Sequence, residues 1–286
     1  MVQVGIAKKF NIPDIIIGLT IVSIGTSMPE LFVSITSSIK KASDISIGNI
    51  IGSNLCNLLL ILGLTAIIKD IKFKKNTKYI EIPFLIFTNI FLFILAQDGT
   101  ISRKESCLLV FLFIVFLTYT YIEAKKSQAI NSLNTSNINI FKCIVLIIIG
   151  IIALKYGGEF VVNNAKSLAL IFNISEKIIG STIIAIGTSL PELVTSVVSA
   201  IKGSTDLALG NIIGSNLFNI LLILGTSSFI NSINFNLEYN LDIIILYSAS
   251  ILLFLFPHLS KKDYMSKKEG LLFLGAYIFY IFTLFF

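Results

Sequence analysis

Two stretches of this chain are nearly the same sequence, and they lie 162 residues apart. The first reads Gly-Thr-Ser-Met-Pro-Glu over residues 25–30 and Gly-Asn-Ile-Ile-Gly-Ser-Asn-Leu-Cys-Asn over residues 48–57. The second reads Gly-Thr-Ser-Leu-Pro-Glu over residues 187–192 and Gly-Asn-Ile-Ile-Gly-Ser-Asn-Leu-Phe-Asn over residues 210–219. Residues 20–63 and 182–225 agree at about 28 of 44 positions without a gap. The chain is therefore an internal duplication.

The composition indicates that both copies lie in a membrane. Hydrophobic residues make up 55% of the 286 residues, charged residues only 13%, and the mean hydropathy is +0.90; a soluble domain is about 25% charged. Apolar runs of roughly 18 or more residues recur, each long enough to cross a ~30 Å hydrocarbon layer. We predict an all-α polytopic membrane protein, a helical bundle of two inverted repeats with about nine transmembrane helices. The expected spans are 11–39, 45–68, 79–97, 104–123, 139–165, 173–201, 207–230, 240–257 and 268–286.

The charged residues predict how the chain is divided and oriented. Residues 124–138, rich in Ser, Asn and Lys, are expected to be a cytoplasmic linker between a first repeat (1–123) and a second (139–286). With the N-terminus inside, 15 Lys and Arg residues fall inside and six outside. The positive-inside rule therefore predicts a multi-pass protein of the cell membrane with its N-terminus inside and its C-terminus outside. The two motif helices then run in opposite directions, an arrangement typical of secondary transporters with a site at the midplane.

The first part of each motif supplies the oxygen ligands that hard cations prefer. Proline lacks an N–H and kinks a helix, which frees backbone carbonyls. Such backbone is tolerated in a membrane only where it is buried in protein or lines a cavity. The freed carbonyls, the hydroxyl groups and the two carboxylates could converge on Ca²⁺ or Na⁺. Two carboxylates would neutralise one Ca²⁺, and without a cation at least one of them would tend to take up a proton. The residues concerned are Thr26, Ser27, Glu30, Thr188, Ser189 and Glu192.

The second part of each motif combines packing glycines with further polar side chains. The Gly-x-x-x-Gly spacing allows close approach of another helix. Each serine and the asparagine four positions later share a helical face, so we assign them as ligands; these are Ser53 with Asn57, and Ser215 with Asn219. Asn54 and Asn216 point elsewhere and are expected to make structural contacts. The acidic residues at span ends, Glu81, Asp98, Glu123 and Glu238, are expected to be solvated.

These motifs resemble those of the calcium/cation antiporter superfamily, and specifically of the prokaryotic sodium/calcium exchangers. The signature, Gly-Thr-Ser-x-Pro-Glu followed by Gly-Ser-Asn-x-x-Asn, occurs twice, and the resemblance covers essentially the whole chain. It implies two inverted five-helix repeats and exchange of extracellular Na⁺ for intracellular Ca²⁺ by alternating access, with no enzymatic activity. It also implies that two helices, one from each repeat, slide together across the core to switch access.

The resemblance also implies roles for individual residues. A central calcium site would use Glu30 and Glu192 with the carbonyls of Thr26 and Thr188. The flanking sodium sites would use Ser27, Ser53, Ser189 and Ser215 with the carbonyls of Ser23 and Ala185, and Asn57 and Asn219 would complete the cluster. Potassium-dependent relatives carry an acid at one of the last two positions, so the resemblance implies K⁺-independent exchange.

Two other functions stay open from the sequence: a Ca²⁺/H⁺ or other cation/proton antiporter, and an inactive truncated membrane protein. The second arises because residues 139–165 precede the second motif helix, while the first repeat has no such span. The resemblance therefore implies that the family's first helix is missing from this chain. The partners expected are Ca²⁺, Na⁺ and membrane lipid. No cofactor, no nucleic acid and no obligate protein partner is expected.

Overall fold

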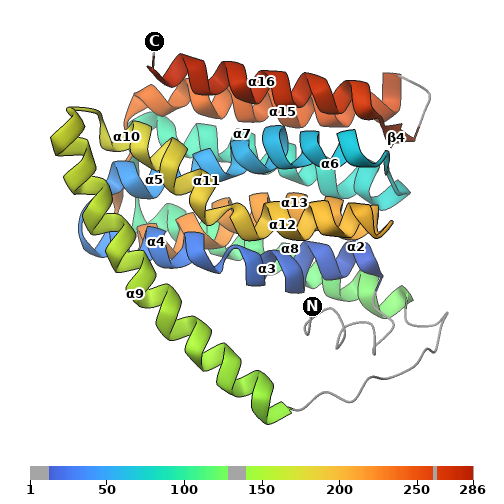
Figure 1. Ribbon diagram of the computed structural model, residues 1–286, viewed down its shortest axis with the longest axis horizontal. Coiled ribbons are helices and arrows are strands. Elements are labelled where there is room, and N and C mark those ends of the chain that lie inside the picture. The colour runs from blue at the N-terminus through green and yellow to red at the C-terminus, as the bar shows by residue number, and fades with distance from the viewer. Residues whose placement is uncertain (1–12, 128–139, 260–262, 286) are drawn as a thin grey trace.

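The computed structural model describes residues 13–127, 140–259 and 263–285, and it is almost entirely helical (Figure 1). The helices of the first half are α2 (Asp14–Ile17), η1 (Gly18–Val22), α3 (Ser23–Thr26), α4 (Met28–Ile39), α5 (Ser43–Leu55), η2 (Cys56–Ile61), α6 (Leu62–Ile68), η3 (Thr77–Glu81), α7 (Ile82–Leu95), η4 (Ala96–Asp98) and α8 (Arg103–Ser127). Those of the second half are α9 (Ile140–Phe172), α10 (Glu176–Ile179), η5 (Gly180–Ile184), α11 (Ala185–Thr188), α12 (Leu190–Ile201), α13 (Thr205–Phe218), η6 (Asn219–Leu224), α14 (Gly225–Ile230), η7 (Leu237–Tyr239), α15 (Asn240–Leu259) and α16 (Lys267–Phe285).

Many of these short elements join into longer helices. Among the described residues, five continuous helices are long and apolar enough to cross a membrane, and two bent helix pairs also pass if each is one span. The five are Ser43–Ile68, Thr77–Asp98, Arg103–Lys126, Thr205–Ile230 and Leu237–His258. The long helix α9 crosses the others obliquely in Figure 1, and α16 lies beside α15 at the top of the view. The helical membrane fold predicted from the sequence is confirmed.

Four two-residue strands, not expected from the sequence, tie the two halves together. β1 (Ile71–Lys72) pairs antiparallel with β4 (Tyr264–Met265), and β2 (Thr100–Ile101) pairs antiparallel with β3 (Ile233–Asn234). Each pair joins a connection of the first half to one of the second half.

The expected linker is only partly described. Its first four residues, 124–127, are the last residues of α8, which continues to Ser127. Residues 128–138 lie outside the described part of the chain, as do residues 1–12, on which the expected shortening of the first repeat falls.

The repeats meet through their glycines at the centre of the molecule. A Cβ atom at Gly52 would lie 2.7 Å from the Cα and carbonyl oxygen of Ser181, so α5 is seated against η5. In the second repeat, a Cβ atom at Gly214 would lie 2.7 Å from the carbonyl oxygen of Leu19, so α13 is seated against η1. The close packing predicted for the Gly-x-x-x-Gly spacing is therefore confirmed, and each repeat contacts the motif helix of the other.

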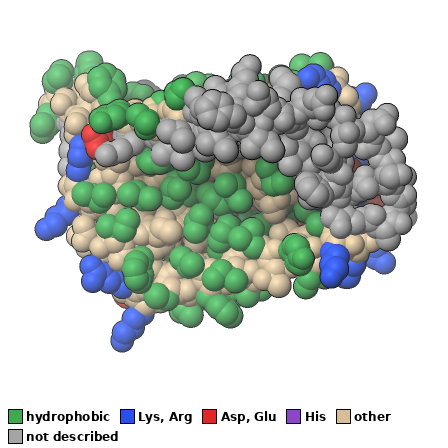
Figure 2. Space-filling view, turned by 90° about the horizontal axis from the view of Figure 1, so that it is seen from below, with side chains coloured by type: hydrophobic (Ala, Val, Ile, Leu, Met, Phe, Trp, Pro, Cys, Tyr) green, Lys and Arg blue, Asp and Glu red, His purple; other side chains and the backbone are tan. Residues whose placement is uncertain are grey.

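The outer surface is suited to lipid. In the face shown in Figure 2, hydrophobic side chains cover the middle while Lys and Arg gather towards the left and right ends. Large apolar side chains such as Phe111, Phe160 and Phe279 are more than half exposed. An apolar band between two basic rims is what a membrane-spanning bundle needs.

Candidate cation-binding site

Both motif helices bend inside the motif. Helix α3 ends at Thr26 and α4 begins at Met28, with Ser27 between them in a non-helical conformation and a bend of 47°. The second copy bends by 44° between α11 and α12, at Ser189. Each motif proline stands in the first turn of the new helix, where its missing N–H leaves no helical bond unmade. The kink expected from the sequence is confirmed.

The bend places each motif glutamate in the first turn of a new helix. The helix N-terminus favours negative charge there, because its backbone N–H groups lack helical partners. Glu30 and Glu192 are both fully buried. A charged group at such depth is costly unless it is compensated.

Each glutamate is hydrogen-bonded by the opposite repeat. Ser27 Oγ donates to Glu192 Oε1 at 2.8 Å, and Ser189 Oγ donates to Glu30 Oε1 at 3.2 Å. The second oxygen, Oε2, of each carboxylate is buried and has no hydrogen-bond partner. The two motifs therefore form one cluster that holds two incompletely satisfied carboxylates.

Hydroxyl and carbonyl oxygens surround the carboxylates. Ser215 Oγ lies 3.4 Å from Glu192 Oε1. Ser53 Oγ lies 3.4 Å from the carbonyl oxygen of Ala185 and 3.4 Å from Thr188 Oγ1. The carbonyl of Ser23, the counterpart of Ala185, accepts from the Ser27 N–H at 2.9 Å and from Thr26 Oγ1 at 3.4 Å.

The two motif asparagines are buried near the starts of η2 and η6. Both amide atoms of Asn57 lack a hydrogen-bond partner. Asn219 donates from Nδ2 to Asn54 Oδ1 at 2.9 Å, while its own Oδ1 has no partner. Asn54 in turn donates to the carbonyl of Asn216 at 3.2 Å. Asn54 thus makes the structural contacts expected of it.

Sequence reasoning missed the third asparagine of each copy, Asn49 in the first and Asn211 in the second. Asn49 Oδ1 accepts from Thr188 Oγ1 at 3.1 Å, and Asn211 Oδ1 accepts from Thr26 Oγ1 at 3.1 Å. Their amide groups donate to Ser34 and Ser196, respectively. Each asparagine therefore fixes a threonine of the other repeat. Their recurrence in both copies of the Gly-Asn-Ile-Ile-Gly stretch was the available signal.

The donor set fits hard cations. The cluster offers carboxylate, hydroxyl, amide and carbonyl oxygens, and no three His, Cys, Asp or Glu side chains among the described residues are placed so that they could hold a metal ion together. No ion pair found among the described residues involves Glu30 or Glu192. Two carboxylates without a basic partner suit Ca²⁺ or Na⁺.

Not all of the acidic residues at span ends are solvated. Glu81 is only 2% exposed, and its Oε1 accepts a 3.4 Å hydrogen bond from the Tyr119 hydroxyl. The expectation that it would face water is wrong because α8 brings Tyr119 over it. Glu123 also departs from the expectation, because its side chain is only 19% exposed and accepts a 2.8 Å hydrogen bond from Asn76 Nδ2. Asp98 and Glu238, in contrast, are exposed as expected.

Comparison with known proteins agrees with this geometry. The family model described as "Sodium/calcium exchanger protein" matches residues 3–122 and 142–286. An uncharacterized membrane protein of Methanocaldococcus jannaschii is 38% identical over 280 residues, which is 98% of this chain and 89% of that protein. The sodium/calcium exchanger MaX1 of Methanosarcina acetivorans is 31% identical, over 98% of this chain and 91% of its own length.

A solved structure shows the same fold. The sodium–calcium exchanger NCX_Mj soaked with Na⁺ and Sr²⁺ superposes with a TM-score of 0.76 at 37% sequence identity, covering 98% of this chain and 90% of that one. The family match, the overall identity and the fold agree. The chain therefore belongs to the sodium/calcium exchanger family of membrane antiporters.

Proposed function

We propose that this antiporter moves Ca²⁺ in one direction and Na⁺ in the other through the buried cluster of Glu30 and Glu192. The observation that carries the proposal is the pair of fully buried carboxylates, one from each repeat, each with one oxygen atom free of hydrogen bonds. Together they carry a charge of about −2, which one Ca²⁺ neutralises.

The calcium site would lie between the two carboxylates, with the carbonyls of Thr26 and Thr188. Sodium ions would occupy flanking positions, one near Ser53, Ala185 and Thr188, the other near Ser23, Ser27 and Ser215. The 3.4 Å separations around Ser53 Oγ and Ser215 Oγ are long for hydrogen bonds, which leaves these oxygens available to a cation. Ser189, Asn57 and Asn219 would complete the ligand set.

Competition between the two ions would couple their fluxes. Both ions need the negative charge of the same two carboxylates. The cluster would therefore not bind Ca²⁺ and its full number of Na⁺ ions at the same time. Each conformation would open the cluster to one side of the membrane. A cavity of about 350 Å³ between α9 and the motif helices, with Pro29, Gly157 and Thr188 in its wall, is a candidate element of that opening. The repeats 1–123 and 139–286 would be the two halves that alternate.

Flux measurements with purified protein test the proposal. In proteoliposomes loaded with Na⁺, dilution into Na⁺-free medium containing radiolabelled Ca²⁺ should drive Ca²⁺ uptake. Uptake should vanish when the Na⁺ gradient is absent, and should persist when a proton ionophore is added. Uptake driven by a pH gradient alone would contradict Na⁺ coupling.

Two substitutions test the assignment of the carboxylates. Glu30→Gln and Glu192→Gln should each abolish Ca²⁺ uptake, because each removes half of the neutralising charge from a low-dielectric site. Asp70→Asn, at an exposed position between α6 and β1, is the control and should transport normally. Near-normal uptake by either of the first two variants, at equal expression, would remove that residue from the site.

The exchange should not require K⁺. Asn57 and Asn219 are neutral, so the cluster offers no third carboxylate for another cation. Replacing K⁺ with choline on both sides of the vesicles should leave Na⁺-driven Ca²⁺ uptake unchanged. A strong K⁺ requirement would contradict this.

A further inference from the structure

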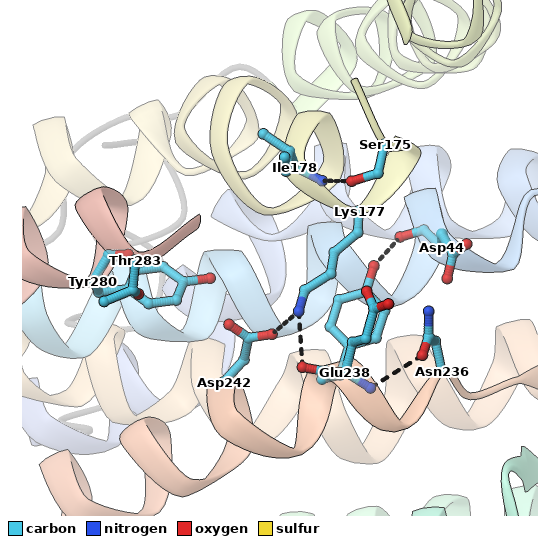
Figure 3. A network of polar contacts seen from close by, with 10 residues as sticks. Asp44, Ser175, Lys177, Ile178, Asn236, Glu238, Asp242, Tyr280 and Thr283 are labelled. Atoms are coloured by element: carbon cyan, nitrogen blue, oxygen red, sulfur yellow. Dashed lines mark hydrogen bonds and ion pairs between the residues drawn. The ribbon is translucent and has the colours of Figure 1, made fainter. Parts of the chain in front are cut away.

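A buried ion pair holds one end of the second motif helix. Lys177 stands near the start of the helix Glu176–Thr188, and its Nζ lies 3.0 Å from Asp242 Oδ2 on α15. The same Nζ donates to the carbonyl of Glu238 at 2.8 Å and lies 4.8 Å from the ring centroid of Tyr239. The side chains of Lys177 and Asp242 are only 14% and 3% exposed. Figure 3 shows Lys177 reaching from its helix into this network.

The network extends to a third helix. The Tyr239 hydroxyl donates at 2.8 Å to the carbonyl oxygen of Asp44, in the first turn of α5. The N-termini of the two helices beside this network are also capped. The Ser175 side chain accepts from the Ile178 N–H at the start of α10, and the Asn236 side chain accepts from the Glu238 N–H at the start of η7 (Figure 3). One lysine thus connects the motif helix to α15 directly and to α5 through Tyr239.

The two helices joined in this way carry one half of the cation cluster. Helix α5 supplies Ser53, and the helix that begins beside Lys177 supplies the Ala185 carbonyl and Thr188. Eight residues separate Lys177 from Ala185, about 12 Å of helix. Because Gly52 leaves no room between α5 and η5, the two helices cannot shift independently there. The same two helices are therefore held together at two places, at the Lys177–Asp242 ion pair, called the anchor below, and beside Ser53, whose Oγ lies 3.4 Å from each of its two neighbours.

Among the described residues, the equivalent positions of the first repeat hold no ion pair. The positions 162 residues before Lys177 and Asp242 are Ile15 and Ile80, which cannot form an ion pair. The nearest counterpart is the pair between Lys74 and Asp206 at 2.6 Å, with side chains 51% and 26% exposed. Asp206 is the repeat equivalent of Asp44. An exposed pair of this kind contributes little, whereas removing one partner of a buried pair leaves an uncompensated charge and is strongly destabilising.

We propose that Lys177 is a positioning residue for the half-site formed by Ser53, the Ala185 carbonyl and Thr188, and that it sets the sodium affinity of that half-site from about 12 Å away. This rests on the proposed function, in which these oxygens bind Na⁺. Ca²⁺ binding depends mainly on the two carboxylates, so it should depend much less on Lys177.

The test compares two apparent affinities in one protein. Lys177→Met keeps the aliphatic stem and removes the charge, and Lys74→Met removes the exposed pair as the matched control. In proteoliposomes, Lys177→Met should raise the Na⁺ concentration for half-maximal exchange at least threefold while changing the KM for Ca²⁺ less than twofold. Lys177→Arg, which keeps the charge, should recover most of the Na⁺ affinity, and Lys74→Met should change neither value.

Several outcomes would overturn the proposal. An unchanged Na⁺ dependence in Lys177→Met would show that the anchor does not act on the site. Equal shifts for Na⁺ and Ca²⁺, or a fall in Tm with unchanged affinities, would assign Lys177 a purely structural role. If Lys177→Met fails to fold, Asp242→Asn gives the same comparison, since it keeps a hydrogen-bond acceptor for Lys177. Failure of the proposed function would appear separately, as full transport by Glu30→Gln.

Discussion

At the scale of single residues, the two repeats complete each other. The glutamate of each motif is hydrogen-bonded by the serine of the other, at 2.8 and 3.2 Å, and the threonine of each motif by the asparagine of the other, at 3.1 Å in both cases. Within one repeat, the corresponding contact is the longer one of 3.4 Å between Ser215 Oγ and Glu192 Oε1. A cation bound in the proposed cluster would therefore contact both repeats at once.

Asn49 and Asn211 give a test of this cross-repeat support. Asn49→Ala and Asn211→Ala should each remove the acceptor that one repeat offers to a threonine hydroxyl of the other. Because each hydroxyl keeps a carbonyl of its own helix as an acceptor, the expected cost is about 0.5–1.5 kcal/mol. We expect the KM for Ca²⁺ to rise on the order of tenfold in proteoliposome uptake. Asn231→Ala, which removes a partly buried hydrogen bond to the carbonyl of Ser38, is the control and should keep the wild-type KM. Unaltered KM values in both test variants would show that the threonines need no such support.

At the scale of elements, the site depends on helices that depart from regular geometry. Four π-helical stretches occur in the described residues around the cluster, η1 and η5 before the two bends, and η2 and η6 after Ser53 and Ser215. Such stretches are rare and concentrate at functional sites. Their recurrence in both repeats indicates that they belong to the duplicated unit.

Helix packing at the glycines should control the same geometry. Gly52→Ala would push a methyl group to within 2.7 Å of Ser181, so α5 and η5 must separate. Overpacking of this kind costs about 1–3 kcal/mol. We expect a lower Tm in detergent and weaker Ca²⁺ uptake. Gly275→Ala, with open space around it in α16, should match or slightly exceed wild-type stability. Wild-type Tm and uptake in Gly52→Ala would mean that the contact can relax freely.

The motifs allowed the bends, the close glycine packing and the fold class to be predicted, because each follows from local sequence. The remaining features depend on distant partners. Asn49 meets Thr188 across 139 residues, and Glu81 is buried by Tyr119, 38 residues away on another helix. A π-helical stretch differs from an α-helix by one backbone hydrogen-bond step, which leaves no mark on apolar periodicity. The two-residue strands are too short for any alternating pattern.

At the scale of the whole molecule, the two halves are held together at the cluster and by two strand pairs. β1 pairs with β4 beside the expected inner loops, and β2 pairs with β3 beside the expected outer loops. Within the part of the chain that the structure describes, the two motif helices nevertheless begin differently. The second begins at the buried Lys177–Asp242 pair, and the equivalent positions of the first repeat are the uncharged Ile15 and Ile80. The sequence is duplicated, but the contacts at the starts of the two motif helices thus differ.

Because the Lys177–Asp242 pair lies at one end of the molecule, the orientation decides on which side of the membrane this pair stands. The orientation can be tested. The distribution of lysines predicts that β1 lies on the cytoplasmic side and the start of α8 outside. In a variant with Cys56, Cys107 and Cys143 replaced by serine, the exposed positions Lys72 and Lys104 can each be changed to cysteine. In sealed right-side-out vesicles, a membrane-impermeant maleimide should label Lys104→Cys directly and Lys72→Cys only after permeabilisation. The reverse pattern would place the Lys177–Asp242 pair on the cytoplasmic side. The pair would then act on Na⁺ that is released from the cluster into the cytoplasm.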